Sequence, residues 1–449
     1  MERFRVNGLV AKAPRRWGVV GRLQRPLYAN ALYLWANAVA MAVGGFAFWA
    51  LAARLYSAEE VGLGAASLSA MTLLATFSHL GLGMGLVRFL PELKGRGPSL
   101  LNLGLSISGL MAVLASGIFL AGLPIWSSPL SYLREQPFHA AGFALFTVAA
   151  TATIIQDQAF IAVRRAGYLL GKNPLSLVLR VALLGFFASL WGPFGIVAAS
   201  GLASLVGLFI GLSLLRRALP SYQPNLVLER GPGAFLHFAI GNHVADLMLG
   251  APALVLPIMV VNVLGSGQGA YFYVGWFLGH ILLVISYSLA LSLFAEGSHD
   301  RASLAVLSWN ALALALLVVG SGGLLVALTG DKLLLAFGSA YSREAAGLVR
   351  LIAVASLPSV LVHLYLSVQR VRKDIPALVS LSALVALVTL GTSYLLLPRL
   401  GIEGAGVGIL AGYGLGAVVA LVRLWAEVKR AGTVALALLR SGSRKEAGL

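Results

Sequence analysis

The sequence predicts an all-α integral membrane protein, with about 12 transmembrane helices in two six-helix bundles related by pseudo-two-fold symmetry. Three observations lead to this prediction. Of the 449 residues, 59% are hydrophobic and only 11% are charged, and the mean hydropathy of +0.89 is far above that of soluble domains. Apolar runs of about 20 residues, enough to cross a bilayer as a helix, recur along the chain. The two halves also resemble each other.

The apolar runs, with short polar connections between them, define the expected helices and the expected parts of the chain. In the first half the helices are residues 28–53, 61–87, 99–122, 139–163, 174–191 and 194–215. In the second half they are residues 234–263, 270–294, 302–328, 345–368, 375–397 and 404–425. The expected parts are a basic N-terminal arm (1–27), a first bundle (28–217), a linker (218–233), a second bundle (234–428) and a basic tail (429–449).

Lysine and arginine residues concentrate in every second connection between the expected helices, which places most of them on one side of the membrane. One set of connections, together with both ends of the chain, holds 26 of the 33 basic residues, whereas the opposite set holds six. Because cytoplasmic loops collect basic residues, both termini are expected to lie in the cytoplasm. The expected location is the inner or plasma membrane of the cell. The N-terminal arm lacks the apolar core of a signal peptide. The net charge of +17 is thereby explained without a nucleic-acid partner.

An internal similarity relates the sixth helix to the twelfth. Residues 192–207 align with residues 401–416, and both carry a small residue at every fourth position. These small residues are Gly195, Ala199, Ala203 and Gly207 in the first half and Gly404, Gly408, Gly412 and Gly416 in the second. Upstream, residues 163–174 and 368–376 are both basic and end in a proline that is expected to start the next helix. Parallel repeats of this kind are typical of secondary transporters, whose substrate path lies between the repeats.

Residues 30–93 resemble the polysaccharide-biosynthesis flippases of the multidrug/oligosaccharidyl-lipid/polysaccharide exporter superfamily. The resemblance rests on Asn30, Ala53-Arg54-Leu55-Tyr56, Glu60 with Gly62, Gly81-Leu82-Gly83 and Arg88-Phe89-Leu90-Pro91. It implies export of a polyprenyl-pyrophosphate-linked oligosaccharide, the repeat unit of a polysaccharide, from the inner to the outer leaflet of the membrane by alternating access. It also implies that the protein works with enzymes of glycan synthesis, and that helices 1, 2, 7 and 8 wall a central cavity.

The expected substrate-binding residues follow from this resemblance. Arg54, at the outer end of the walls, and Arg88, at the inner end, would bind the phosphate headgroup at successive stages. Asn242, on the seventh helix, is a further expected substrate-binding residue. No arginine is expected at the middle of the cavity that helices 1, 2, 7 and 8 would form. Tyr273 and Trp276 could stack on sugar rings, although an aromatic belt at the membrane interface predicts the same residues.

Charged residues inside the expected spans are a second set of candidates. Asp246 lies near the middle of the seventh helix, where an ionised carboxylate costs about 2.5–3.5 kcal/mol. Because Asn242 and His243 lie one turn earlier on the same face, Asp246 and His243 predict a site for coupling to H⁺ or Na⁺. A structural hydrogen bond between the halves is the alternative. Asp157 and Arg180, at similar depths on neighbouring helices, predict a structural ion pair rather than a transport relay.

Other function classes have less support. The chain has neither a GxxxxGK[ST] phosphate loop nor an HExxH metal-binding pair, and the expected outer connections hold at most about 16 residues. No enzymatic activity, cofactor or metal is therefore expected. The nearest alternative is an ion-coupled multidrug or cation antiporter of the same superfamily, or another twelve-helix carrier. The first helix lacks a carboxylate for an organic cation, so Asp246 alone supports that alternative. A scaffold without transport would not need Asp246.

Overall fold

The computed structural model describes residues 26–90, 97–220, 222–225, 233–299, 304–372 and 374–446, in which the regular structure is helical throughout. The first half contains α2 (Pro26–Leu55), α3 (Ala58–Ser78), α4 (Leu82–Phe89), α5 (Gly97–Trp126), η1 (Ser128–Leu130), α6 (Tyr132–Glu135), α7 (Pro137–Ala162), α8 (Gly167–Phe187) and α9 (Gly192–Ala218). The second half contains α10 (Gly233–Leu264), α11 (Ser266–His299), α12 (Leu304–Leu334), α13 (Ser339–Arg372), α14 (Ile375–Leu400) and α15 (Glu403–Glu446).

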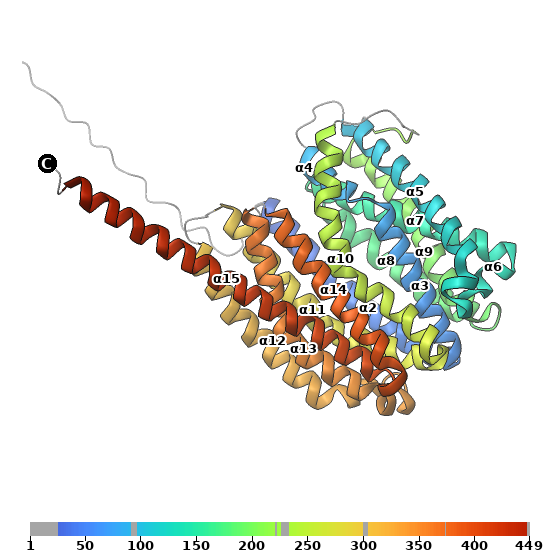
Figure 1. The fold of residues 1–449 in the computed structure, drawn as a ribbon. Coiled ribbons are helices and arrows are strands. Elements are labelled where there is room, and N and C mark those ends of the chain that lie inside the picture. The colour runs from blue at the N-terminus through green and yellow to red at the C-terminus, as the bar shows by residue number, and fades with distance from the viewer. Residues whose placement is uncertain are drawn as a thin grey trace, which may run out of the picture.

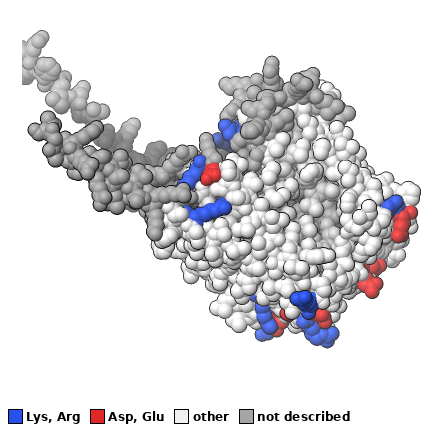
Figure 2. All heavy atoms as spheres, viewed as in Figure 1, with Lys and Arg blue, Asp and Glu red and all other residues white. Residues whose placement is uncertain are grey.

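Twelve of the described helices are long and apolar enough to cross a membrane. They are α2, α3, α5 and α7–α15, so the predicted number of spans is confirmed. On the face shown in Figure 2, the described charged side chains gather at two opposite ends of the molecule, and the flank between them is uncharged. This distribution suits a protein whose middle is surrounded by lipid.

The two halves form two six-helix bundles that pack in the same way (Figure 1). In the first bundle α2 packs on α8, α7 packs on α5 and α9, and α8 packs on α9. The second bundle repeats each pairing, with α10 on α14, α13 on α12 and α15, and α14 on α15. The predicted two-bundle architecture is therefore confirmed, and the internal similarity of the sequence corresponds to repeated helix pairings.

The small residues at every fourth position lie in the last helix pair of each bundle. A Cβ atom added to Gly408 would lie 2.1 Å from the Ser393 hydroxyl oxygen, and one added to Gly412 would lie 2.0 Å from that of Thr389. In the first bundle, a Cβ atom at Gly207 would lie 2.7 Å from the hydroxyl oxygen of Ser176. These distances show that α9 approaches α8, and α15 approaches α14, closely enough to need glycine.

Most helices extend beyond their predicted bounds, as α13 does to Arg372, and two further differences change where helices of the first bundle begin and end. The expected second helix, residues 61–87, is divided into α3 and α4, because Leu80 (φ 49°) and Gly81 (φ 70°) adopt left-handed backbone conformations that end α3. Pro174 was expected to start a helix but lies inside α8, which begins at Gly167. Pro376 does lie in the first turn of α14, as predicted.

The connection between α2 and α3 ends in a helix cap that its sequence encodes. The Ser57 side chain accepts the backbone N–H of Glu60 (3.2 Å), and the Glu60 carboxylate accepts the backbone N–H of Ser57 (2.9 Å). This reciprocal pair is a capping box, which stabilises the start of α3. The two glutamates of this connection thus begin a helix at the polar end of the bundle.

The bundles contact each other near this same end. Arg54 donates a hydrogen bond from Nη2 to the backbone oxygen of Ala336 (3.2 Å), and the Ser127 hydroxyl donates to Oδ1 of Asn262 (2.7 Å). Gly62 lies so close to α11 that an added Cβ atom would be 1.8 Å from the backbone oxygen of Ser266. These contacts close this end of the molecule between the bundles. The last helix, α15, leaves from the opposite end (Figure 1).

Candidate substrate-binding cavities between the bundles

Two adjoining cavities lie within the described helices, and both include side chains from the two bundles. The N cavity, of about 550 Å³, is lined mainly by α2, α3 and α7–α9, with contributions from α10 and α11. The C cavity, of about 420 Å³, is lined mainly by α10, α11 and α13–α15, with contributions from α3, α4 and α7. Ala253, Trp276 and His280 line both, so the cavities meet at these residues.

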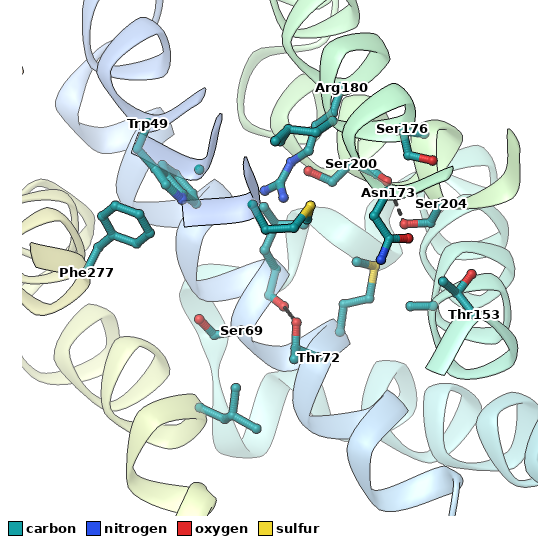
Figure 3. A pocket seen from close by; sticks show the side chains of 18 of the residues that line it. Trp49, Ser69, Thr72, Thr153, Asn173, Ser176, Arg180, Ser200, Ser204 and Phe277 are labelled. Carbon is teal, nitrogen blue, oxygen red and sulfur yellow. Dashed lines mark hydrogen bonds between the residues drawn. The ribbon is translucent and has the colours of Figure 1, made fainter. Parts of the chain in front are cut away.

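Arg180 supplies a cation to the N cavity. Its guanidinium carbon lies 3.9 Å from the centre of the Phe48 ring, and its side chain points into the cavity toward the polar groups of α3, α8 and α9 (Figure 3). The buried Nε atom has no hydrogen-bond partner, and the side chain has no ion pair within the described part of the chain. An unpaired guanidinium in an enclosed site favours an anionic ligand. Sequence reasoning had placed no arginine in the middle of the cavity.

The predicted ion pair between Asp157 and Arg180 is wrong. Asp157 instead pairs with Lys172, with 2.5 Å between Oδ1 and Nζ, and its Oδ2 accepts a hydrogen bond from Asn173 (3.3 Å). The prediction failed because it placed Lys172 in a loop before a helix starting at Pro174. Since α8 begins at Gly167, Lys172 is part of the helix and is only 1% exposed.

Hydroxyl groups form much of the remaining polar surface of the N cavity. Thr72, Ser200 and Ser204 each donate to the backbone oxygen four residues earlier on their own helix, at 2.8–3.0 Å. Their oxygens therefore keep lone pairs that can accept hydrogen bonds from a ligand. The Thr153 hydroxyl is buried and has no partner within the described residues. The N cavity thus offers acceptors and a cation together.

The predicted aromatic residues lie at the cavities. The ring of Tyr273 lies 4.4 Å from that of Trp49, and both side chains line the N cavity. Trp276, only 7% exposed, lies where the two cavities meet, with its ring 4.8 Å from that of His280. An aromatic belt alone would not place these rings at the wall of a cavity. Their predicted role in sugar binding is therefore compatible with their positions.

Four of the seven histidines in the sequence line the C cavity. They are His79, His243, His280 and His363. The His79 and His243 rings are 4.5 Å apart, and His79 lies just beyond the end of the α3 span. Burial, and secondarily the neighbouring His243, lowers the pKa of His79 to about 4. The motifs of the sequence did not indicate this cluster, because its members lie on three different helices and one connection.

Asp246 also lines the C cavity, where it forms an ion pair with Arg370 of α13. Sequence reasoning assigned Arg370 to a cytoplasmic connection, so it did not foresee this partner. His243 shares the cavity with Asp246, as predicted from their spacing. The side chain of Asn242 lies outside the described residues. A role for Asp246 and His243 in ion coupling stays a prediction.

The two arginines expected to bind phosphate lie outside the cavities. Arg54 is exposed at the closed end, where it contacts the Ala336 carbonyl. Arg88 is exposed at the other end of the first bundle, with its guanidinium carbon 5.3 Å from the centre of the Phe89 ring. Neither lines the N or C cavity. Within the described cavity walls, Arg180 is therefore the cation best placed for a bound headgroup.

Comparison with known proteins supports the resemblance found in the sequence. The family model of polysaccharide biosynthesis proteins matches residues 27–241. No protein with a curated description matches the chain. Similar solved structures include the lipid II flippase MurJ in an inward closed conformation, which is 12% identical with a TM-score of 0.69; 88% of this chain and 87% of that chain are covered.

Two further similar structures belong to transporters of the MOP (multidrug/oligosaccharidyl-lipid/polysaccharide) superfamily. One is a multidrug resistance MATE family transporter in an inward-facing conformation, at 16% identity and a TM-score of 0.64, covering 92% of this chain and 98% of that chain. The other is a transporter from Pyrococcus furiosus Vc1 (DSM3638) with a binding pocket of reverse polarity, at 14% identity and a TM-score of 0.61, covering 90% and 96%. The chain thus shares the multi-pass fold of these transporters and of MurJ, and residues 27–241 match the model of the polysaccharide biosynthesis proteins, the family that the sequence predicts.

Proposed function

We propose that the protein is a flippase that moves a polyprenyl-pyrophosphate-linked oligosaccharide from the inner to the outer leaflet of the cell membrane by alternating access. The observation that carries this proposal is the unpaired Arg180 inside the N cavity. A pyrophosphate brings several negative charges into a partly dehydrated site, where a guanidinium can donate two parallel hydrogen bonds to its oxygens. The polysaccharide biosynthesis family of the first half supports a glycan as the cargo.

The charges of the cavities also argue against the cation antiporter. Both carboxylates that line them are already held by cations, Asp157 by Lys172 and Asp246 by Arg370. An organic cation would therefore have to displace a basic side chain to find a counter-ion, with Arg180 still nearby. An anionic headgroup meets an available guanidinium instead. The similar solved structures are transporters and a flippase, which fits movement of a substrate rather than its chemical conversion.

The distribution of basic residues and the closed end support the proposed direction of movement. If the ends rich in lysine and arginine face the cytoplasm, the Arg54–Ala336 contact closes the outer side, and the described state is closed to the outside. Arg88 would then meet the headgroup near the cytoplasmic surface before Arg180 does, and Arg54 would be released when the outer side opens. Asp246 and His243 remain the proposed groups for coupling the cycle to H⁺ or Na⁺.

The test is lipid translocation in reconstituted vesicles. Purified protein in proteoliposomes should move a fluorescent short-chain polyprenyl pyrophosphate that carries one sugar, and Arg180→Gln should lower the initial rate at least tenfold. Arg180→Lys should retain part of the rate, because it keeps the charge but loses the planar donor pair. Arg343→Gln, at an exposed site on α13, is the matched control and should keep the full rate. An unchanged rate for Arg180→Gln would remove Arg180 from the mechanism, and uptake of an organic cation without lipid translocation would favour the antiporter.

A further inference from the structure

We infer that the C cavity binds the sugar part of the substrate and is built for an uncharged sugar. This inference rests on the proposed flippase function and adds the location and chemical class of the glycan. It comes from three features of the C cavity: its balanced charges, its buried polar atoms without partners, and its ring-rich wall.

The charges of the C cavity are balanced, unlike those of the N cavity. Asp246 is neutralised by Arg370, and the side chains keep 41% and 19% exposure, respectively. No lysine or arginine is among the described residues that line the C cavity. The described wall of the C cavity therefore offers no unpaired cation comparable to Arg180 of the N cavity. The part-exposed carboxylate of Asp246 can still accept hydrogen bonds from hydroxyl groups, whereas an anionic sugar would find no available cation in the C cavity.

Several buried polar atoms around the C cavity have no partner within the described residues. They are Nε2 of His243, Nδ1 of His363 and the hydroxyl oxygen of Thr389. All three residues line the cavity and are at most 8% exposed. A buried polar atom without a partner is unfavourable, so a ligand rich in hydroxyl groups would gain by bonding to such atoms. Sugar hydroxyls both donate and accept, and they suit imidazole nitrogens of either tautomer.

Flat rings lie beside one of these polar groups, the imidazole of His363. The ring of His363 lies 5.7 Å from the rings of both Tyr287 and Tyr413, at interplanar angles of 79° and 70°. Trp276 stands at the junction with the N cavity. A pocket of 300–1,000 Å³ with apolar and aromatic walls and a few convergent polar groups is the usual form of a small-molecule site. The C cavity, at about 420 Å³, has this form.

The junction between the cavities matches the chemistry of the proposed substrate. A lipid-linked glycan joins an anionic pyrophosphate directly to its first sugar. The unpaired cation lies on one side of Trp276 and His280, and the partnerless polar atoms lie on the other. A single ligand that crosses the junction could therefore place its pyrophosphate at Arg180 and its sugar in the C cavity.

The experiment compares the affinities of three probes for the full-length protein in nanodiscs. The probes are a short-chain polyprenyl pyrophosphate, the same lipid carrying a neutral N-acetylhexosamine, and the same lipid carrying a hexuronic acid. For the unaltered protein, the neutral sugar should tighten binding about tenfold relative to the bare lipid, and the acidic sugar should bind less tightly than the neutral one. Equal or tighter binding of the acidic probe would overturn the uncharged-sugar part of the inference.

Variants then locate the sugar. Thr389→Val removes one hydroxyl at nearly constant shape, and His363→Gln replaces a partnerless imidazole. Each should weaken binding of the neutral-sugar probe at least threefold while leaving the affinity for the bare lipid unchanged. Thr147→Val is the matched control, because this buried hydroxyl lies outside both cavities and already donates to Phe143 (2.8 Å). Arg180→Gln should weaken binding of both probes equally.

The outcomes separate this inference from the proposed function. If the bare lipid binds and is translocated, but neither C-cavity variant changes the contribution of the sugar, the C cavity is not the sugar site and the flippase function stands. If the variants weaken both probes equally, the cavity does not distinguish sugar from lipid and the inference also fails. If none of the three lipids binds, the flippase function itself fails.

Discussion

Asp157 and Lys172 form an ion pair at the wall of the N cavity, with 2.5 Å between Oδ1 and Nζ. The Lys172 side chain is inaccessible to solvent, whereas that of Asp157 keeps 27% exposure toward the cavity. The pair joins α7 to α8, two helices whose contact is otherwise small. It also neutralises the carboxylate that lines the described wall of the N cavity, so Arg180 sets the charge of this cavity.

Lys172→Met should destabilise the protein, because it leaves the Asp157 carboxylate without its cation. Removing one partner of a buried pair costs about 3–5 kcal/mol in soluble proteins, whereas replacing both by apolar residues is often neutral. The apparent thermal midpoint in detergent should therefore be lower for Lys172→Met than for the double variant that adds Asp157→Leu. Lys332→Met, at an exposed site, should leave the midpoint unchanged. A double variant that melts below the single variant would contradict this account.

Crosslinking Ser127 to Asn262 should stop transport. Their side chains form a 2.7 Å hydrogen bond that joins the segment before η1 to α10 at the closed end. The sequence contains no cysteine, so a Ser127→Cys, Asn262→Cys variant carries only the introduced pair. A short thiol-specific crosslinker should hold this end closed and abolish lipid translocation in proteoliposomes. If the linker is cleavable by reductant, adding reductant should restore translocation. Either single cysteine variant, treated in the same way, is the control. Full transport after complete crosslinking would show that this contact does not open during the cycle.

Gly408→Ala and Gly414→Ala should have opposite effects, although both change a glycine of α15 to the better helix former. A Cβ atom at Gly408 would lie 2.7 Å from the Thr389 backbone oxygen and force α15 away from α14. At Gly414 no atom lies within 4 Å of the added carbon. Gly414→Ala should therefore raise stability by up to about 1 kcal/mol, as expected for alanine in a helix, and Gly408→Ala should lower the thermal midpoint. Equal midpoints for the two variants would contradict the close approach of these helices.

Acid should destabilise the protein in part through His79. Its folded-state pKa of about 4 lies below the ordinary value near 6.5. Between pH 6.5 and pH 4 the unfolded chain therefore binds a proton at this position that the folded protein does not, so stability falls as the pH falls through this window. His79→Asn should show a smaller drop in thermal midpoint between pH 7.5 and pH 5 than the unaltered protein, while His139→Asn, outside both cavities, should follow the unaltered protein. An identical drop in His79→Asn would exclude this contribution.

The sequence predicted the number of helices and the two bundles, because a bilayer requires long apolar runs in the spans and places charged residues in the connections. Both features can be read from short stretches of sequence. It did not predict the partners of buried charges. The pairing of Asp157 depended on whether Lys172 was helical, and Pro174 gave a misleading boundary because proline is tolerated within α8. Arg180 was assigned to a structural pair, so its availability in the N cavity was missed. The C cavity was not predicted either, because the residues that line it come mainly from five helices, α10, α11, α13, α14 and α15.

The break between α3 and α4 has a mechanical consequence. The α3 rod is fixed to the second bundle at the closed end, where Gly62 touches the Ser266 carbonyl. The short α4 rod begins after the left-handed turn at Leu80 and Gly81, beside the Ala239 carbonyl of α10. A change of a few backbone angles at this joint would swing α4 without bending α3. In the proposed orientation, this movement would widen or narrow the inner mouth of the pathway while the contacts at the closed end stay in place.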